Sequence, residues 1–116
     1  MKEKAGELGR LLGQGDEYRA LARARERMSG DRECVHALNR LAELEQTVAE
    51  VLERGEEPPV DLREEYERVF SDLQGSPVYQ AVVAAQSNFD KVLARVNEEI
   101  LAGIEAGSRS RIILPT

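Results

Sequence analysis

Glu33 and His36 are the pair of residues with the clearest metal-ligand spacing, Glu-x-x-His, within a stretch of helical pattern. Carboxylate-bridged di-metal bundles use two such motifs and two further glutamates, all pointing into the bundle. The chain has a single histidine, and at about 100° per residue His36 lies away from the apolar helix face that contains Cys34 and Leu38. We therefore expect His36 to face solvent and expect no metal site. A metal-binding bundle is kept as a lesser alternative.

Cys34 is the one cysteine of the chain, so no intramolecular disulfide can form. Its place on the apolar side of a helical stretch predicts a buried thiol, and buried structural thiols are unreactive. The sequence contains no Cys-x-x-Cys pair, no glycine-rich phosphate loop after a strand and no Ser/His/Asp set. We therefore expect no catalytic residues, no cofactor and no enzymatic activity.

Arg19, Arg23 and Arg27 are spaced by four and share one helix face. Like charges at this spacing repel mildly, which leaves two interpretations. The arginines either pair with the glutamates of later helices or stay solvated, or they form a docking stripe for an acidic partner or RNA, together with Arg109 and Arg111. The net charge of −6 and pI near 4.9 disfavour a general nucleic-acid binder. We expect no direct nucleic-acid binding, and an RNA-associated protein is the alternative function.

The stretch from Ser76 to Ala106 must be the dominant element, because it runs free of Pro and Gly from Val78 to Ala102 with apolar residues three and four apart. Ser76 suits an N-cap and Pro77 a first helical position. Such a helix is about 45 Å long, whereas a compact globule of this size has a radius of gyration of about 13 Å. It must therefore protrude or be covered by a second protomer. The expected interface with that second copy comprises Val82, Phe89, Val96 and Ile100.

Four shorter helices are expected before it, near residues 3–12, 17–28, 32–54 and 61–74. Asp16 and Asp31 are the expected N-caps of the second and third, and Asp61 with Glu64 resembles a capping box for the fourth. Gly55 is the expected C-cap of the third helix. The predicted fold is all-α: a dimeric bundle of four to five helices with one long C-terminal helix.

Length and composition favour one domain, residues 1–106, followed by a non-helical C-terminal tail, residues 107–116. That tail either folds back on its own bundle or pairs with a partner. Charged residues make up 33% and apolar residues 41% of the 116 positions, a mixture typical of a soluble helical protein. We find no signal-peptide pattern and no run long enough for a membrane span, so we expect a cytoplasmic protein without membrane partners.

Several segments together resemble the YlbF/YmcA (YheA-like) family of small bacterial helical regulatory proteins. They are Glu-Leu-Gly-Arg-Leu-Leu-Gly-Gln-Gly-Asp-Glu-Tyr at 7–18, Arg-Ala-Arg-Glu-Arg at 23–27, Ser-Pro-Val-Tyr-Gln-Ala at 76–81 and Phe-Asp-Lys-Val-Leu-Ala-Arg-Val-Asn at 89–97. The resemblance spans about residues 8–115, and its motifs are helix-face patterns without catalytic signatures.

This resemblance implies an all-α adaptor without enzymatic activity, which assembles with itself and with family paralogues or an RNase complex. The processes it implies are RNase-dependent mRNA processing, competence, sporulation and biofilm control. Some family members carry C-terminal cysteines associated with an iron–sulfur cluster. Residues 108–116 contain no cysteine, and Cys34 alone cannot supply the usual four thiolates, so no cluster is expected here.

Overall fold

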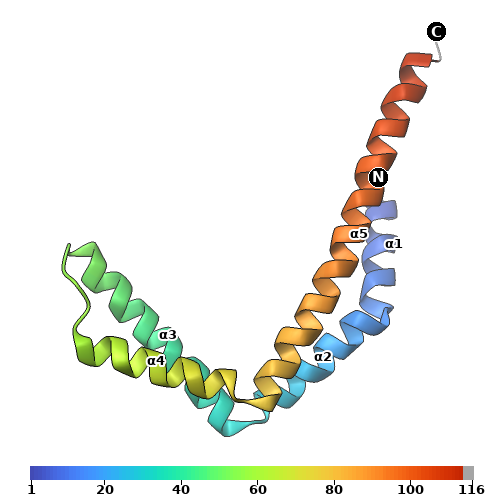
Figure 1. Cartoon of the computed structure of the whole chain (residues 1–116). Helices are drawn as coiled ribbons and strands as arrows, with labels where there is room; N and C mark the ends of the chain where they lie inside the picture. The colour runs from blue at the N-terminus through green and yellow to red at the C-terminus, as the bar shows by residue number, and fades with distance from the viewer. Residues whose placement is uncertain (114–116) are drawn as a thin grey trace.

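The computed structural model describes residues 1–113, with side chains as far as Arg109. Every regular element in this range is an α-helix. The helices are α1 (Lys2–Gln14), α2 (Asp16–Ser29), α3 (Arg32–Glu53), α4 (Val60–Gln74) and α5 (Pro77–Ile113) (Figure 1). The predicted all-α fold with one long final helix is confirmed.

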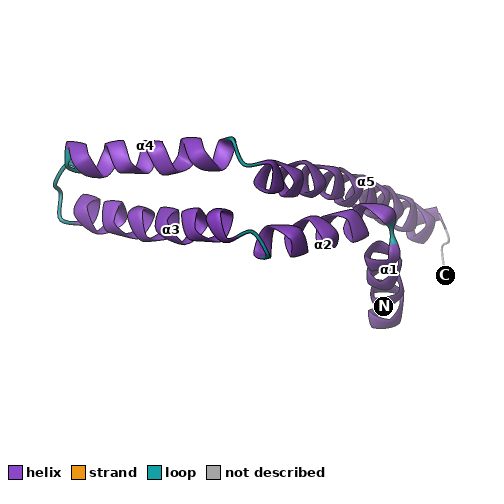
Figure 2. Ribbon diagram, turned by 90° about the horizontal axis from the view of Figure 1, so that it is seen from below, coloured by secondary structure: helices purple, strands orange, loops and turns teal. Residues whose placement is uncertain are grey.

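The helices form two arms that meet at an elbow (Figures 1 and 2). In the long arm, α2 packs along the first half of α5, whereas α1 contacts α2 and its N-terminal end points away from α5 (Figure 2). In the hairpin arm, α3 and α4 pack against each other as an antiparallel pair. The chain extends over 70 × 38 × 21 Å with a radius of gyration of 21.6 Å. A compact chain of this length would have a radius of gyration of about 13 Å.

The elbow forms because two short turns interrupt the helices at the same place (Figure 2). Gly30 and Asp31 connect α2 to α3, and Gly75 and Ser76 connect α4 to α5. After each turn a side chain caps the next helix: Asp31 Oδ1 accepts from the backbone N–H of Cys34 at 2.9 Å, and Ser76 Oγ accepts from that of Tyr79 at 3.3 Å. Both predicted N-caps are confirmed.

Two other predicted caps are wrong. Gly15 is the N-cap of α2, and Asp16 is already in its first turn without a capping hydrogen bond. Pro59 is the N-cap of α4, and Asp61 likewise lies inside the helix. Both carboxylates still lie in the first turn, where negative charge interacts favourably with the helix dipole.

The turn after α3 depends on Gly55, whose φ of 77° favours glycine. The Gly55 N–H donates to the Leu52 carbonyl at 3.0 Å, and the Glu56 N–H donates to the Val51 carbonyl at 3.2 Å. These two bonds form a Schellman motif, in which Gly55 is the residue that follows the C-cap. The glycine ends the helix as predicted, one position beyond the C-cap Arg54.

The prediction of a non-helical tail from residue 107 is wrong for residues 107–113, because α5 continues to Ile113. Gly103 and Gly107 lower helix stability by about 1 kcal/mol each relative to alanine, which does not end a helix of this length. The Arg109 guanidinium also pairs with Glu105 one turn earlier at 3.1 Å, across Gly107. Residues 114–116 lie outside the described part of the chain.

Each arm has its own small core. In the long arm Leu21, Ala24 and Ala85 are buried, and Ala81, Val82 and Phe89 pack against them. In the hairpin arm Leu44 and Val51 are buried, and Cys34 and Leu73 are buried near the elbow. The buried apolar residues of the described chain are thus seven: Leu21, Ala24, Cys34, Leu44, Val51, Leu73 and Ala85.

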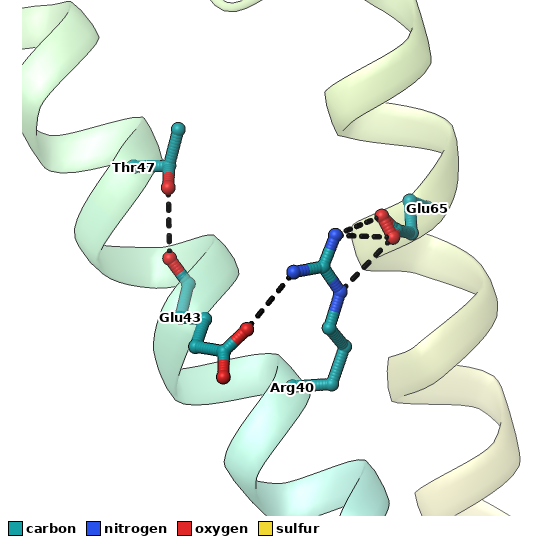
Figure 3. Close-up of polar contacts among 4 residues, drawn as sticks. All are labelled: Arg40, Glu43, Thr47 and Glu65. Atoms are coloured by element: carbon teal, nitrogen blue, oxygen red, sulfur yellow. Dashed lines mark hydrogen bonds and ion pairs between the residues drawn. The ribbon is translucent and has the colours of Figure 1, made fainter.

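An ion pair joins the helices of the hairpin arm (Figure 3). The Arg40 guanidinium donates to Glu65 Oε2 through Nε at 3.1 Å and through Nη2 at 2.8 Å, and it also donates to Glu43 at 3.0 Å. Hydrogen bonding to Arg40 lowers the pKa of Glu65 below its ordinary value. This paired geometry fixes the register of α3 against α4 at mid-hairpin.

Candidate interaction surfaces

The first half of the expected interface on α5 belongs to the long arm's own packing. Val82 and Phe89 are half-buried against the Leu21–Ala24–Ala85 cluster. The Phe89 ring meets Tyr18 of α2 edge-on, with ring centroids 5.2 Å apart and planes at 64°. This arrangement is favourable beyond simple apolar burial. Val82 and Phe89 therefore hold α2 against α5.

The second half of that face extends past α2 and has little cover. Val96 is half-buried, whereas Leu93, Ile100 and Ile104 expose 41%, 47% and 62% of their surface. These four residues form what we call the α5 stripe, spaced three or four apart on one helix face. In α1, Leu8 reaches this region, where it lines an open hollow together with Val96 and Ile100. The α5 stripe is therefore an apolar helix face that the protomer covers only in part.

The accessible surface of the chain is unusually large for its mass. It amounts to 9237 Å² for 12.9 kDa. Folded monomers of that mass expose about 6300 Å². The difference exceeds the roughly 800 Å² that each partner buries in a standard protein–protein interface. The extended shape thus leaves ample surface for a stable assembly.

The arginine stripe lies on the outer side of α2. Arg19, Arg23 and Arg27 are all exposed. None of the three forms an ion pair with any residue that the structure describes. The interpretation that they pair with glutamates of α3 or α4 is therefore wrong, while solvation and partner docking stay open. Arg109 pairs with Glu105, and the Arg111 side chain lies outside the described part.

Cys34 and His36 lie where the sequence predicted. Cys34 is 3% exposed and His36 is exposed. Both line a polar cleft of about 730 Å³ at the elbow, with Asp31, Arg40 and Asp72 among its walls. Within the described residues no three His, Cys, Asp or Glu side chains gather closely enough to hold a metal ion.

A groove on the hairpin arm was not predicted. It is lined by apolar and aromatic residues, Val48, Ala49, Leu52, Pro58 and Tyr66, and by the charged Glu45, Arg63 and Glu67. We call this the hairpin groove, and its volume is about 410 Å³. Two signals in the sequence indicate it in hindsight: Leu52 directly beside the buried Val51, and a run of glutamates on both sides of the Pro-Pro turn.

These observations define an all-α chain made of a helical hairpin and a long-helix arm. The chain belongs to the YlbF/YmcA family: residues 1–105 match the family described as "Control of competence regulator ComK, YlbF/YmcA". The resemblance seen in the sequence is thereby confirmed, and the family links the chain to competence regulation.

Among solved structures, the chain is similar to a "Protein of Unknown Function (DUF964) from Bacillus stearothermophilus". The two share 17% identity with a TM-score of 0.66, over 94% of this chain and 96% of the other. That likeness supports the fold. No curated protein matches the sequence. None of the helices in the described residues has the length and apolarity needed to cross a membrane.

Proposed function

We propose that this protein is a non-catalytic, homo-oligomeric helical adaptor that acts in competence regulation. The α5 stripe is the observation that carries the proposal. An apolar helix face of this kind is unfavourable in water and is stabilised when a second protein surface covers it. The self-association surface proposed here comprises Val96 and Ile100 of the set that the sequence predicted, together with Leu93 and Ile104, whereas Val82 and Phe89 pack against α2 within the protomer.

The energetic case for self-association rests on burial. Fully burying a Leu, Ile or Val side chain contributes about 1.5–3 kcal/mol. Leu93, Ile100 and Ile104 recur in each copy, so a symmetric pairing covers six such side chains. This gain is large enough to offset a substantial part of the entropy cost of association. A second copy is the simplest partner, because its α5 carries the same stripe.

The adaptor proposal extends to partners beyond the chain itself. Family paralogues or an RNase complex are the proposed partners, and mRNA processing, sporulation and biofilm control are proposed as processes alongside competence. These proposals come from membership of the family. The two-armed shape supports them, because one arm can hold a second copy while the other stays accessible.

An RNA-associated protein is the second candidate function. The exposed Arg19, Arg23 and Arg27 on α2, without ion-pair partners among the described residues, favour it. Binding through such a stripe would weaken steeply as salt rises, because phosphate contacts release counterions. RNA binding at low salt that is lost in an Arg23→Glu variant would support this candidate.

The adaptor proposal is tested by a pull-down of the tagged protein from its native cytosol, with and without nuclease, read by mass spectrometry. We expect family paralogues or an RNase to survive nuclease treatment. If all partners disappear with nuclease, RNA holds them, and the arginine stripe becomes the leading site.

A further inference from the structure

The hairpin groove is an apolar site at the far end of the molecule from the α5 stripe. Val48, Ala49 and Leu52 of α3 face Pro58 and Tyr66 across it. Leu52 is 57% exposed and lies at this open edge. Tyr66 is held in place from two sides: its ring stacks on Phe70 with centroids 6.3 Å apart, and its hydroxyl lies 3.4 Å from Glu45 Oε1. The groove is therefore a formed surface with a fixed aromatic wall.

Its surroundings are strongly acidic. Residues 43–67 contain ten acidic and two basic side chains, a net charge of −8, although the whole chain carries only −6. Glu45 and Glu67 line the groove itself, and Arg63 is the one basic residue among its lining residues. Such a field attracts cationic segments and repels anionic ones over about 8–10 Å at physiological salt.

The described helices of the chain itself match the groove less well than a strongly basic helix would. The arginine face of α2 has suitable charge, but its neighbours on that face are small or acidic, such as Ala20 and Asp16. The exposed part of α5 has bulky apolar side chains, but Glu98, Glu99 and Glu105 balance its Lys91, Arg95 and Arg109. On α1 the exposed Leu11 is accompanied by Lys2, Lys4 and Arg10, but Glu3 and Glu7 offset most of their charge. A second copy would therefore bring apolar side chains with little net positive charge, whereas the acidic groove favours a strongly basic helix.

We infer that the hairpin groove binds a basic amphipathic helix of a partner protein. An apolar side chain of that helix fills the space between Leu52 and Tyr66, and flanking lysines or arginines pair with Glu45 and Glu67. Amphipathic helices bind apolar grooves in this manner at several kinds of interface. The inference names the partner chemistry for the proposed adaptor function and rests on it, but it uses a different arm from self-association.

The test measures the binding of a fluorescent helical peptide of leucine and lysine, with a leucine–glutamate peptide of the same spacing as the charge control. Leu52→Ser and Glu67→Lys are the groove variants. Their matched controls are Leu101→Ser, at a residue that is also 57% exposed, and Glu98→Lys, both on α5. We expect each groove variant to weaken binding about tenfold and each control to bind like the wild type.

Equal affinity for both peptides, equal binding by all four variants, or no binding to the wild type would each overturn the inference. NMR signals of the groove's backbone amides would be recorded without peptide at several protein concentrations. Signals that change with concentration would show that a second copy fills the groove, and this result would also overturn the inference. Light scattering separates this result from the proposed function: groove variants keep the wild-type mass, and a monomeric wild type that still binds the peptide leaves the groove assignment intact.

Discussion

Both arms pack helices together without a large core, but the contacts between the helices differ from one arm to the other. In the long arm, small residues let the helices approach: Ala24 and Ala85 are buried beside Leu21, and one polar bond, Arg25 to Gln86 at 2.8 Å, crosses the interface at its edge. In the hairpin arm, leucine and valine packing is combined with the Arg40–Glu65 ion pair. The long arm thus depends on close apolar contact, and the hairpin arm combines apolar contact with an ion pair between its two helices.

The arms also differ in charge and in helix length. Residues 32–74 contain five basic and twelve acidic side chains, whereas the remainder contains eleven basic and ten acidic ones. In the long arm, the 37-residue α5 extends beyond the 14-residue α2, and this leaves the α5 stripe partly uncovered. The hairpin arm carries most of the acidic charge and contains the hairpin groove. In our proposals, self-association and partner binding therefore use different arms.

The largest effect is expected from Phe89→Asp. The substitution removes the ring that contacts Tyr18 and places a carboxylate against the Leu21 cluster. We expect a loss of about 4 kcal/mol in the free energy of unfolding, because a cavity and an unpaired charge are created together. Chemical denaturation followed by circular dichroism measures it. A variant that keeps wild-type stability and assembly would contradict the packing of the long arm.

Truncating one leucine in each arm tests whether the arms are separate cooperative units. Leu21→Ala and Leu44→Ala each remove a fully buried side chain, at a cost of about 3 kcal/mol. Hydrogen exchange should then accelerate mainly in α2 and α5 for the first variant and in α3 and α4 for the second. Uniform acceleration over both arms in either variant would mean that the elbow transmits stability and that the arms fold as one unit.

A smaller effect is expected at the caps. Asp31→Ala removes the acceptor for the Cys34 N–H and should cost about 1 kcal/mol. Asp61→Ala is the matched control, because Asp61 makes no capping bond and its loss should stay within about 0.5 kcal/mol. Thermal melts of both variants measure the difference, and equal losses would restore the capping box that the sequence suggested.

The smallest effect concerns pH and the hairpin arm. Arg40 lowers the pKa of Glu65 below its ordinary 4.5, so the unfolded chain takes up a proton at that carboxylate before the folded chain does. The contribution of the pair to stability is therefore fully present above pH 4.5 and is lost as pH falls through the native pKa. Amide hydrogen exchange in α3 and α4, measured as pH is lowered, tests this. Glu65→Gln should make the exchange rates in these helices less sensitive to acid, whereas Glu64→Gln, at an exposed neighbouring residue, should not.

Much of the fold follows from local patterns in the sequence. The three-and-four apolar spacing located all five helices, and the capping chemistry of Asp31 and Ser76 marked two of their starts correctly. Asp16 lies one residue and Asp61 two residues after the true N-cap, because an acidic residue is favourable both as N-cap and within the first turn. The sequence predicts that the last helix ends before Gly107, but a glycine flanked by a Glu105–Arg109 pair only weakens a long helix.

The division into two arms could not be predicted in the same way. Periodicity shows which face of a helix is apolar, but not which other helix covers it. The elbow exists because the turns at Gly30 and Gly75, which are far apart in the sequence, lie at the same place in the fold. The hairpin groove exists because α3 packs against α4. The length of the final helix predicted that part of its apolar face would be uncovered, but not which part: Val82 and Phe89 of the predicted interface pack against α2.

If the α5 stripe joins copies of the chain, as we propose, light scattering on the wild type and on Ile100→Asp will show it. Ile100 is 47% exposed on the part of α5 beyond α2, so the substitution should leave the protomer folded. We expect a wild-type mass of at least twice the 12.9 kDa chain and a mass equal to one chain for a folded Ile100→Asp. A wild type that stays at one chain mass across micromolar concentrations, or a variant that assembles unchanged, would contradict it.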